Sequence, residues 1–301
     1  MSQVILHHYP RSFFAQKIRT ILAFKRIPWR SVEQPMTMPK PHLTALTGGY
    51  RRVPVLQIGA DAYCDSALIA RELERRYPEP TIYATCPLVQ TFEDWADRRL
   101  VQQIMPAVVL AMLPTLPADI LVDRAAMSPT MNKPVLERIA PHMFDQARLS
   151  FDRLDALLRT TPFLLGDQFS AADAACYHPI WFLQNAPALF AEIETRPALA
   201  KWCARIGELS VGDANPMCVD EALGIARDAT PANDARGAAP NAKGLRRGDA
   251  TAIVADDYGV ERSCGALTTL TPDEIVLTRR DDSLGEVAVH FPRMGYRVAR
   301  A

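Results

Sequence analysis

The sequence of 301 residues predicts three structural parts: an α/β domain, an all-helical domain and a small antiparallel β-domain. Three successive hydrophobic patterns predict this division. Up to about residue 82, short apolar runs alternate with amphipathic helical stretches, which is typical of an α/β fold. After Pro87 the apolar residues keep helical spacing. Beyond residue 246, short apolar runs separated by glycine and aspartate indicate antiparallel strands.

The α/β part, expected over residues 1–82, shows the element order βαβ, α, ββα. A βαβ unit requires a parallel pair of strands, whereas a short hairpin requires an antiparallel pair. Gly48 and Gly49 are expected to end the middle helix, and Gly59 to turn the hairpin. The expected strands are Val4–His7, Trp29–Glu33, Val53–Ile58 and Ala62–Asp65, and the expected helices are Phe13–Arg26, Lys40–Leu46 and Ser66–Tyr77.

The helical part, expected over residues 87–228, consists of stretches with helical periodicity. In the first stretch Pro106 has no amide hydrogen to donate and should kink or end the helix. The expected helices are Thr91–Leu113, Val135–Arg159, Ala171–Gln184, Pro197–Leu209 and Val219–Arg227. The positions of Val135–Arg159 expected to face the core are Ile139, Met143, Leu149, Leu154 and Leu157.

The C-terminal part follows a segment, residues 229–245, that is rich in Ala, Pro, Asn and Gly and is interpreted as a linker. Residues 246–301 then predict four or five antiparallel strands in a barrel-like arrangement. The expected strands are Ala252–Val254, Ala266–Leu270, Ile275–Thr278 and Val287–Phe291.

Composition excludes several classes of protein. Lys plus Arg and Asp plus Glu both number 34, so no basic surface for nucleic acid is expected. The six cysteines form no CxxC pair, which argues against a disulfide framework or a zinc site, and no metal is expected. No signal peptide is expected at the N-terminus, and the longest apolar run, Ile104–Leu116, is too short to cross a membrane. A cytoplasmic enzyme or binding protein is therefore expected, with no membrane partner.

Ser12 is the first candidate for chemistry, because it lies where the first strand turns into the first helix. Free backbone N–H groups and the helix dipole favour an anion at that position. A hydroxyl there can donate a hydrogen bond to a thiolate and so lower the pKa of the thiol. The same serine would also serve as an ordinary helix N-cap.

Two further candidates follow along the chain. Pro54 begins a strand, and a cis bond before it would leave the backbone of Val53 able to pair with an extended peptide. At the next strand-to-helix junction, Asp65 could pair with an amino group and Ser66 could hold a carboxylate. An amino group and a carboxylate on one carbon describe the γ-glutamyl end of glutathione. An ordinary strand-initiating proline and a capping pair are the structural alternatives.

In this order, Ser12, Val53-Pro54 and Asp65-Ser66 resemble the glutathione transferase superfamily over roughly the first 210 residues. Ser12 lies seven residues before Arg19, the spacing of zeta-like and omega-like members. The run from Gly166 to Asp173 matches the capping box and hydrophobic staple of the family. The resemblance implies a thioredoxin-like N-terminal domain, an all-α C-terminal domain and a homodimer; the β-domain is an addition.

The resemblance also implies roles for individual residues. Ser12 would be catalytic, the cosubstrate would be glutathione, and the second substrate would be a small hydrophobic electrophile bound between the two domains. The glutathione-binding residues would be Arg52, Val53, Pro54, Asp65 and Ser66, and the candidate substrate pocket is Tyr9, Phe13, Trp95, Arg98 and Met105. Phe13 replaces the proline of omega-like members, and a serine cannot form a mixed disulfide, so conjugation or isomerisation is favoured over thiol reduction.

Three alternatives stay open at the level of the sequence. The chain could be a non-catalytic binding or regulatory protein on the same fold. It could be a thiol reductase that uses Cys64, although that cysteine has no resolving partner in the sequence. Finally, Asp256-Asp257 and Asp281-Asp282 could hold a hard cation, although Asp-rich hairpin turns are commoner.

Overall fold

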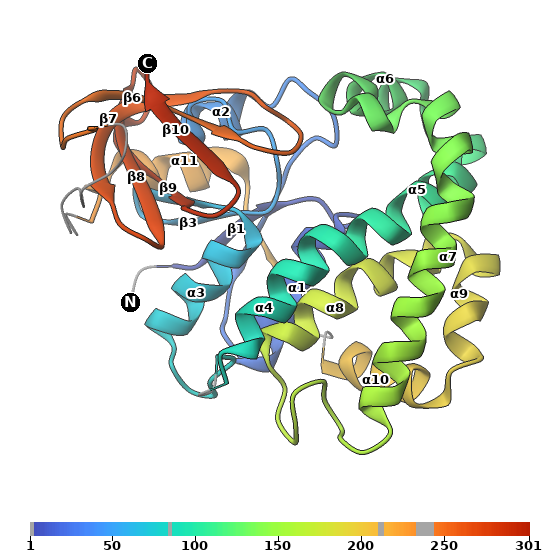
Figure 1. Ribbon diagram of the computed structural model, residues 1–301. Coiled ribbons are helices and arrows are strands. Elements are labelled where there is room, and N and C mark those ends of the chain that lie inside the picture. The colour runs from blue at the N-terminus through green and yellow to red at the C-terminus, as the bar shows by residue number, and fades with distance from the viewer. Residues whose placement is uncertain (1–2, 84–85, 210–213, 233–243) are drawn as a thin grey trace. The chain divides into compact units, whose positions relative to one another are not determined.

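The computed structural model describes residues 3–83, 86–209, 214–232 and 244–301 (Figure 1). It contains two compact units. The first comprises Met1–Ala15, Pro28–Arg71 and Ala214–Ala301, and the second comprises Gln16–Ile27 and Glu72–Asp213. The division runs through helices α1 (Phe13–Phe24) and α3 (Ser66–Arg76). Within the described ranges, every helix is too short or too polar to cross a membrane.

A ten-stranded sheet forms the first unit, with the order β10-β6-β7-β8-β9-β4-β3-β1-β2-β5. The βαβ and ββα topologies expected from the sequence are confirmed, because β1 pairs with β2 in parallel and β3 pairs with both β1 and β4 in antiparallel. Together with the helical unit, this confirms the thioredoxin-like and all-α fold classes. The strands are β1 (Ile5–His8), β2 (Arg30–Glu33), β3 (Val55–Ile58), β4 (Asp61–Cys64), β5 (Asn215–Pro216), β6 (Ala250–Ala255), β7 (Ser263–Leu270), β8 (Glu274–Asp281), β9 (Gly285–Pro292) and β10 (Tyr296–Arg300).

The C-terminal strands continue the N-terminal sheet. Strand β9 pairs in parallel with β4, with Asp61 opposite Ala288 and Tyr63 opposite His290. Strand β4 would otherwise end the sheet and expose unpaired backbone groups, which is a site of unwanted association. Strands β6 to β10 form the antiparallel sheet expected at the C-terminus. They belong to the same compact unit as Met1–Ala15 and Pro28–Arg71. Most of the expected linker, residues 233–243, lies outside the described residues.

The composite sheet curls around a shared hydrophobic core. Buried side chains of β3 and β4, such as Val55 and Cys64, belong to the same cluster as Leu277, Phe291 and Val298 of the C-terminal strands. Figure 1 shows these C-terminal strands, coloured orange to red, curled beside β3. Because of this curvature, residues of β10 approach β4 across the core although four strands separate the two in the sheet order.

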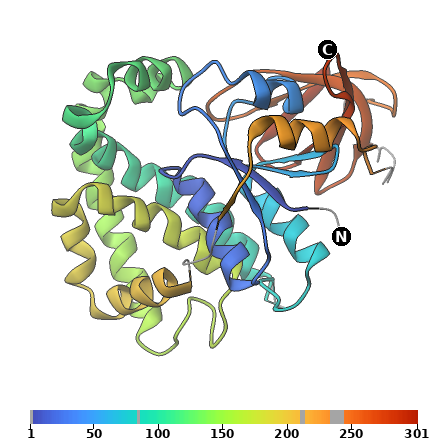
Figure 2. The same ribbon diagram turned by 180° about the vertical axis from the view of Figure 1, so that it is seen from behind.

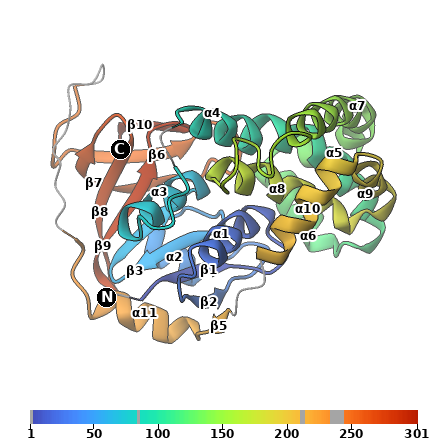
Figure 3. The same cartoon turned by 90° about the horizontal axis from the view of Figure 1, so that it is seen from below.

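Helices α2 (Pro41–Thr47) and α11 (Val219–Arg227) pack against strands of this sheet. Helix α2 ends at Gly48, whose φ of 72° is the left-handed value expected of a glycine cap. Helix α11 contacts α2, β2 and β9 and buries Ala222 and Ala226 (Figures 2 and 3). The expected bounds of α11 are confirmed, whereas the short strand β5 before it was not predicted.

A buried imidazole joins the two parts of the sheet. His290 of β9 contacts Asp61 of β4 through Nε2 at 2.9 Å and Glu274 of β8 through Nδ1 at 2.8 Å. Carboxylates accept hydrogen bonds, so the ring that donates from both nitrogens carries a positive charge. The ring of Tyr63 stacks on it with centroids 4.2 Å apart. The arrangement is a charge bridge across the β4–β9 junction.

The second unit is helical. Helix α7 packs against α5 and α10, and helix α8 packs against α4. The capping box expected at the start of α8 is confirmed, since Asp173 accepts the backbone N–H of Ser170 at 3.0 Å. The helices are α4 (Leu88–Trp95), α5 (Val101–Met112), α6 (Ala118–Met127), α7 (Lys133–Leu158), α8 (Ala171–Phe182), α9 (Pro187–Glu194) and α10 (Pro197–Leu209), with a π-helical segment η1 (Ala96–Leu100) and 3₁₀ turns η2 (Leu113–Thr115), η3 (Pro129–Met131) and η4 (Leu183–Asn185).

The expected core face of α7 was wrong for most positions. Leu149 and Leu157 are 52% and 42% exposed, and Ile139 and Met143 are only partly buried; Leu154 alone is buried as predicted. The buried face instead repeats every three or four residues and consists of Leu136, Ala140, Phe144, Ala147, Phe151, Leu154 and Leu158. This spacing follows the helix period. Alanines, which a search for large apolar residues passes over, complete it.

Pro106 does not end its helix, because α5 continues to Met112. The single expected helix Thr91–Leu113 is nevertheless divided, since the π-helical turn η1 separates α4 from α5. Such a turn carries one extra residue per turn and is often found at functional sites. Helices α6 and α9 were not predicted.

We expect His290→Gln to lower the free energy of unfolding by about 3 kcal/mol, because it leaves Asp61 and Glu274 buried without a cation. Urea unfolding measures this change. His142→Gln is the control, since His142 is exposed and should leave stability unchanged. Equal stability of the two variants would contradict the charge bridge.

The contribution of His290 should depend on pH. Burial lowers its pKa, but hydrogen bonds to Asp61 and Glu274 raise it more, and the net pKa lies above the ordinary value of 6.5. A raised native pKa gives stability that is complete below 6.5 and is lost as pH rises through the native pKa. The difference in unfolding free energy between the wild type and His290→Gln should therefore shrink on the alkaline side. A difference that grows with pH would refute this assignment.

Candidate functional site

Sheet register brings the three sequence-predicted motifs to one edge. Val55, at the start of β3, lies opposite His7 near the end of β1 and opposite Cys64 at the end of β4. Strands β1 and β4 both run antiparallel to β3, so both end where β3 begins. The segments that follow His8, precede Val55 and follow Cys64 therefore meet at this edge. They carry Ser12, Val53-Pro54 and Asp65-Ser66.

Ser12 caps helix α1. Its Oγ accepts the backbone N–H of Ala15 at 3.2 Å, and its own N–H donates to the carbonyl of Tyr9 at 3.0 Å. The residue is 4% exposed. An N-cap hydroxyl that accepts from the third helical residue still has its own hydrogen to donate. Capping and donation to an anion are thus compatible roles for one hydroxyl.

Further along α1, Lys17 fixes the helix through buried ion pairs. Its Nζ lies 2.5 Å from Asp97 Oδ2 and 2.9 Å from Glu93 Oε1, and its side chain is fully buried. Burial lowers the pKa of Lys17, but the two carboxylates raise it further, so the ammonium remains charged. Asp97 also contacts His178 Nε2 at 2.9 Å. Asp97 lies in the π-helical segment and pairs with residues of two helices, Lys17 of α1 and His178 of α8.

Asp65 and Ser66 begin helix α3. Asp65 has a φ of 80°, in the left-handed region that only a few residue types adopt without strain. Its Oδ1 accepts the N–H of Ala67 at 2.9 Å, and its carbonyl accepts the N–H of Ile69 at 3.0 Å. Ser66 is the first residue of an eleven-residue helix and is 5% exposed. The positive end of this helix therefore lies beside a carboxylate held in a constrained backbone.

The Val53–Pro54 peptide bond is cis, as the resemblance implies, and Val53 precedes the first residue of β3. The neighbouring Arg52 does not face open solvent. Its guanidinium pairs with the carboxylate of Asp257 and lies 3.8 Å from the ring centroid of Tyr258. The predicted glutathione residue Arg52 is thus held by the β6–β7 connection.

The C-terminal sheet also reaches Asp65. Tyr296 of β10 donates its hydroxyl to Asp65 Oδ2 at 3.1 Å, and the hydroxyl of Tyr50 lies 3.2 Å from that of Tyr296. Burial raises the pKa of both tyrosines, so both keep their protons at neutral pH. Burial likewise raises the pKa of Tyr258 to about 12.

These contacts were missed at the level of the sequence. Strand β10 was not predicted, although Tyr296 and Val298 alternate with arginine as in a half-buried strand. No local pattern indicates that Asp257 or Tyr296 meets the N-terminal motifs.

The predicted substrate-pocket residues fall in both compact units. In the first unit, the Phe13 ring lies 4.7 Å from that of Phe14, and Tyr9 has the Lys40 ammonium 5.7 Å from its ring. In the second unit, Trp95, Arg98 and Met105 are partly buried on α4, η1 and α5. Arg98 also pairs with Asp94 at 3.1 Å. The role of these residues stays a prediction.

Two alternatives lose support. Burial raises the pKa of the Cys64 thiol well above its ordinary value, so this thiol stays protonated and unreactive at neutral pH. Of the acidic pairs, Asp257 holds Arg52, and Asp281 accepts from Ser283 and pairs with Arg279. Within the described ranges, no group of three or more His, Cys, Asp or Glu side chains is arranged so that it could hold a metal ion.

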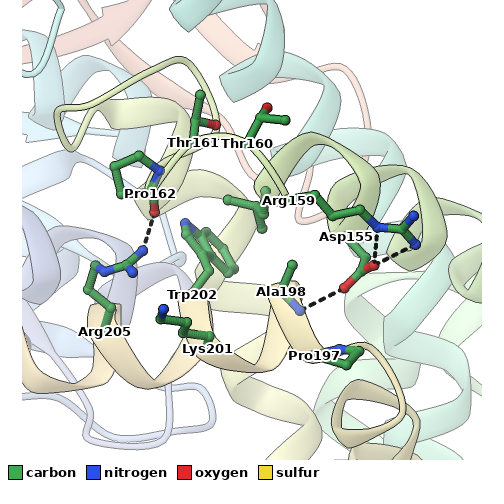
Figure 4. A pocket seen from close by; sticks show the side chains of 11 residues that line it. Asp155, Arg159, Thr160, Thr161, Pro162, Pro197, Ala198, Lys201, Trp202 and Arg205 are labelled. Atoms are coloured by element: carbon green, nitrogen blue, oxygen red, sulfur yellow. Dashed lines mark hydrogen bonds and ion pairs between the residues drawn. The ribbon is translucent and has the colours of Figure 1, made fainter.

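A surface pocket of about 650 Å³ lies in the helical unit, at the α7–α8 connection and α10 (Figure 4). Its polar groups stabilise the fold. Asp155 accepts the N–H groups of Ala198 and Leu199 at 2.9 and 3.1 Å, which caps α10, and Arg205 donates to the carbonyl of Pro162. The pocket contains none of the sequence-predicted site residues.

Comparisons with known proteins identify the families of both domains. The family model "Glutathione S-transferase, N-terminal domain" matches residues 6–81, and "Glutathione S-transferase, C-terminal domain" matches residues 118–205. Among curated proteins, none matches the chain. Solved structures from Methylobacillus flagellatus, with glutathione bound, and from Methylobacterium radiotolerans, with glutathione sulfonate, are 20% and 23% identical. Each match covers 71% of this chain. It covers 100% of the Methylobacillus chain with a TM-score of 0.53 and 95% of the Methylobacterium chain with a TM-score of 0.52, which shows a shared fold.

A GST-like protein from Pseudomonas syringae is more similar. It is 36% identical, with a TM-score of 0.83 over 100% of both chains. The match includes the C-terminal strands, so the added sheet is common to both proteins. On this identity, full coverage and the two family models, the chain belongs to the glutathione S-transferase superfamily.

Proposed function

We propose that the protein is a glutathione S-transferase that activates the thiol of glutathione for attack on a small hydrophobic electrophile. One observation carries the proposal: the register of β1, β3 and β4 brings Ser12, Val53-Pro54 and Asp65-Ser66 to the same edge of the sheet. Each motif alone has an ordinary structural explanation. Their convergence provides a hydroxyl, the extended residues before a strand and a helix N-terminus beside a carboxylate, which match the parts of γ-glutamylcysteinylglycine.

The γ-glutamyl end would bind at α3. Its ammonium group would pair with the Asp65 carboxylate, and its carboxylate would accept from the Ser66 hydroxyl and from the positive end of the helix. The cysteinyl backbone would pair with Val53, which lies two residues before the start of β3. Arg52 adds positive charge beside this site, shared with Asp257.

The thiol would then lie near Ser12. A hydrogen bond from the Ser12 hydroxyl stabilises the thiolate and raises its concentration at neutral pH. The thiolate attacks the electrophilic carbon, a C–S bond forms, and the electron pair passes to the leaving group or to an acceptor atom that takes a proton. The residues proposed to contact the electrophile remain Tyr9, Phe13, Trp95, Arg98 and Met105. We also propose a homodimer, the usual assembly of the family.

The second candidate function is non-catalytic binding or regulation on the same fold. One observation favours it: Arg52 and Asp65 are both contacted by residues of the C-terminal sheet. A site closed to ligand would show such contacts. Binding of glutathione by the wild type favours the transferase, and failure to bind it favours the non-catalytic protein. The two predictions below test conjugation and binding in turn.

Replacing Ser12 should lower the rate of conjugation about 100-fold, because the thiolate loses one hydrogen-bond donor. Ser12→Gly removes the hydroxyl, but glycine is still accepted at a helix N-cap. Ser12→Thr keeps a hydroxyl that can both cap the helix and donate to the thiolate. The rate should fall in the first variant and persist in the second, and the ultraviolet absorbance of bound thiolate should titrate at higher pH in Ser12→Gly. Unchanged rates with every accepted electrophile would remove Ser12 from the mechanism.

Asp65→Asn should weaken glutathione binding about tenfold or more in isothermal titration, because the ammonium group loses its charged partner. Asparagine tolerates the left-handed backbone at this position, so the fold should persist. Asp282→Asn, at an exposed acidic residue, is the charge-matched control. If the wild type fails to bind glutathione at millimolar concentration, the non-catalytic alternative replaces the enzyme.

A further inference from the structure

Asp65 is held from two sides by neutral donors. The backbone N–H of Ala67 donates to Oδ1, and the hydroxyl of Tyr296 donates to Oδ2. The two bonds come from different elements, the first turn of α3 and the first residue of β10. Two hydrogen bonds from different elements fix the plane of the carboxylate.

The donor Tyr296 is itself fixed. Its single proton goes to Asp65, so in the contact between the Tyr50 and Tyr296 hydroxyls, Tyr50 is the donor. The chain of donation therefore runs from Tyr50 to Tyr296 to Asp65. Tyr296 is 7% exposed, and its ring packs on Phe291 with centroids 5.4 Å apart. A buried donor held in this way has one position and one direction.

Two ion pairs also hold the β6–β7 connection of the C-terminal sheet beside the site. The β6–β7 connection carries Asp257 and Glu261, which pair with Arg52 and Arg51. Strand β10 pairs with β6 up to the start of this connection, with Tyr296 opposite Ala255. Displacement of β10 would thus also strain the two ion pairs. The position of the Tyr296 hydroxyl depends on the whole junction.

We propose that the C-terminal sheet is part of the glutathione site of this protein, with Tyr296 as the positioning residue that holds Asp65 ready for the α-ammonium group of a γ-glutamyl thiol. The inference rests on the proposed function, and it assigns to the sheet a role in ligand binding. Tyr296 acts through Asp65 and does not touch the reacting sulfur. Its loss should raise the KM for glutathione and leave kcat at saturating glutathione unchanged.

The test compares Tyr296→Phe with Asp65→Asn and with Tyr177→Phe, in the full chain. Phenylalanine keeps the packing of the ring and removes only the hydroxyl. Tyr177→Phe removes a hydroxyl of another buried tyrosine, on α8, and serves as the control. Isothermal titration with reduced glutathione and steady-state kinetics with a conjugation substrate are measured for each.

Tyr296→Phe should weaken glutathione binding and raise KM about three- to tenfold, as expected for the net loss of one ordinary hydrogen bond. In the double variant with Asp65→Asn, Tyr296→Phe should have no further effect, since both act on one carboxylate. If Asp65→Asn abolishes binding but Tyr296→Phe behaves as Tyr177→Phe does, the positioning role is overturned and the proposed function stands. If neither Asp65→Asn nor Tyr296→Phe alters binding, the proposed site fails, and this inference fails with it.

Discussion

The structure of the first unit depends on the pairing of β4 with β9. This single parallel ladder turns the edge of a five-stranded sheet into the middle of a ten-stranded one. Without it, β4 would present unpaired backbone groups to solvent, and the C-terminal strands would have no neighbour on their β9 side. The His290 bridge lies on this ladder, with one carboxylate from each side. Backbone pairing and a buried charge therefore act at the same place.

The protein handles buried charge in a consistent way. Lys17 in the helical unit and His290 in the sheet are each enclosed by two carboxylates. Removing such charges from water is costly unless partners replace the lost hydration, and each cluster supplies its partners from elements distant in sequence. Such clusters specify which helices and strands can pack together. Lys17 lies on α1, the helix that Ser12 caps, and His290 lies on β9 of the C-terminal sheet.

Much of the candidate site could be predicted from the sequence because its signals are local. Ser12 and Asp65-Ser66 stand at strand-to-helix junctions, and Pro54 stands at a strand start, so hydrophobic periodicity is enough to locate them. Tyr296 could not be found in this way. Its role depends on the curl of a sheet that carries it back to Asp65 across four intervening strands. The core face of α7 was missed for a related reason, since alanines complete a stripe that large side chains alone do not show.

By itself, the sequence determined the order of the main helices and strands, the capping box of α8 and the three motifs of the candidate site. These features follow from interactions over a few residues, such as side-chain periodicity, capping and turn formation. Only the tertiary structure decided that the C-terminal strands extend the N-terminal sheet and that Arg52 and Asp65 meet Asp257 and Tyr296. Strand edges carry nearly the same backbone groups in any sequence, so the choice of a distant partner is made by the shared core and buried charges that the pairing brings together.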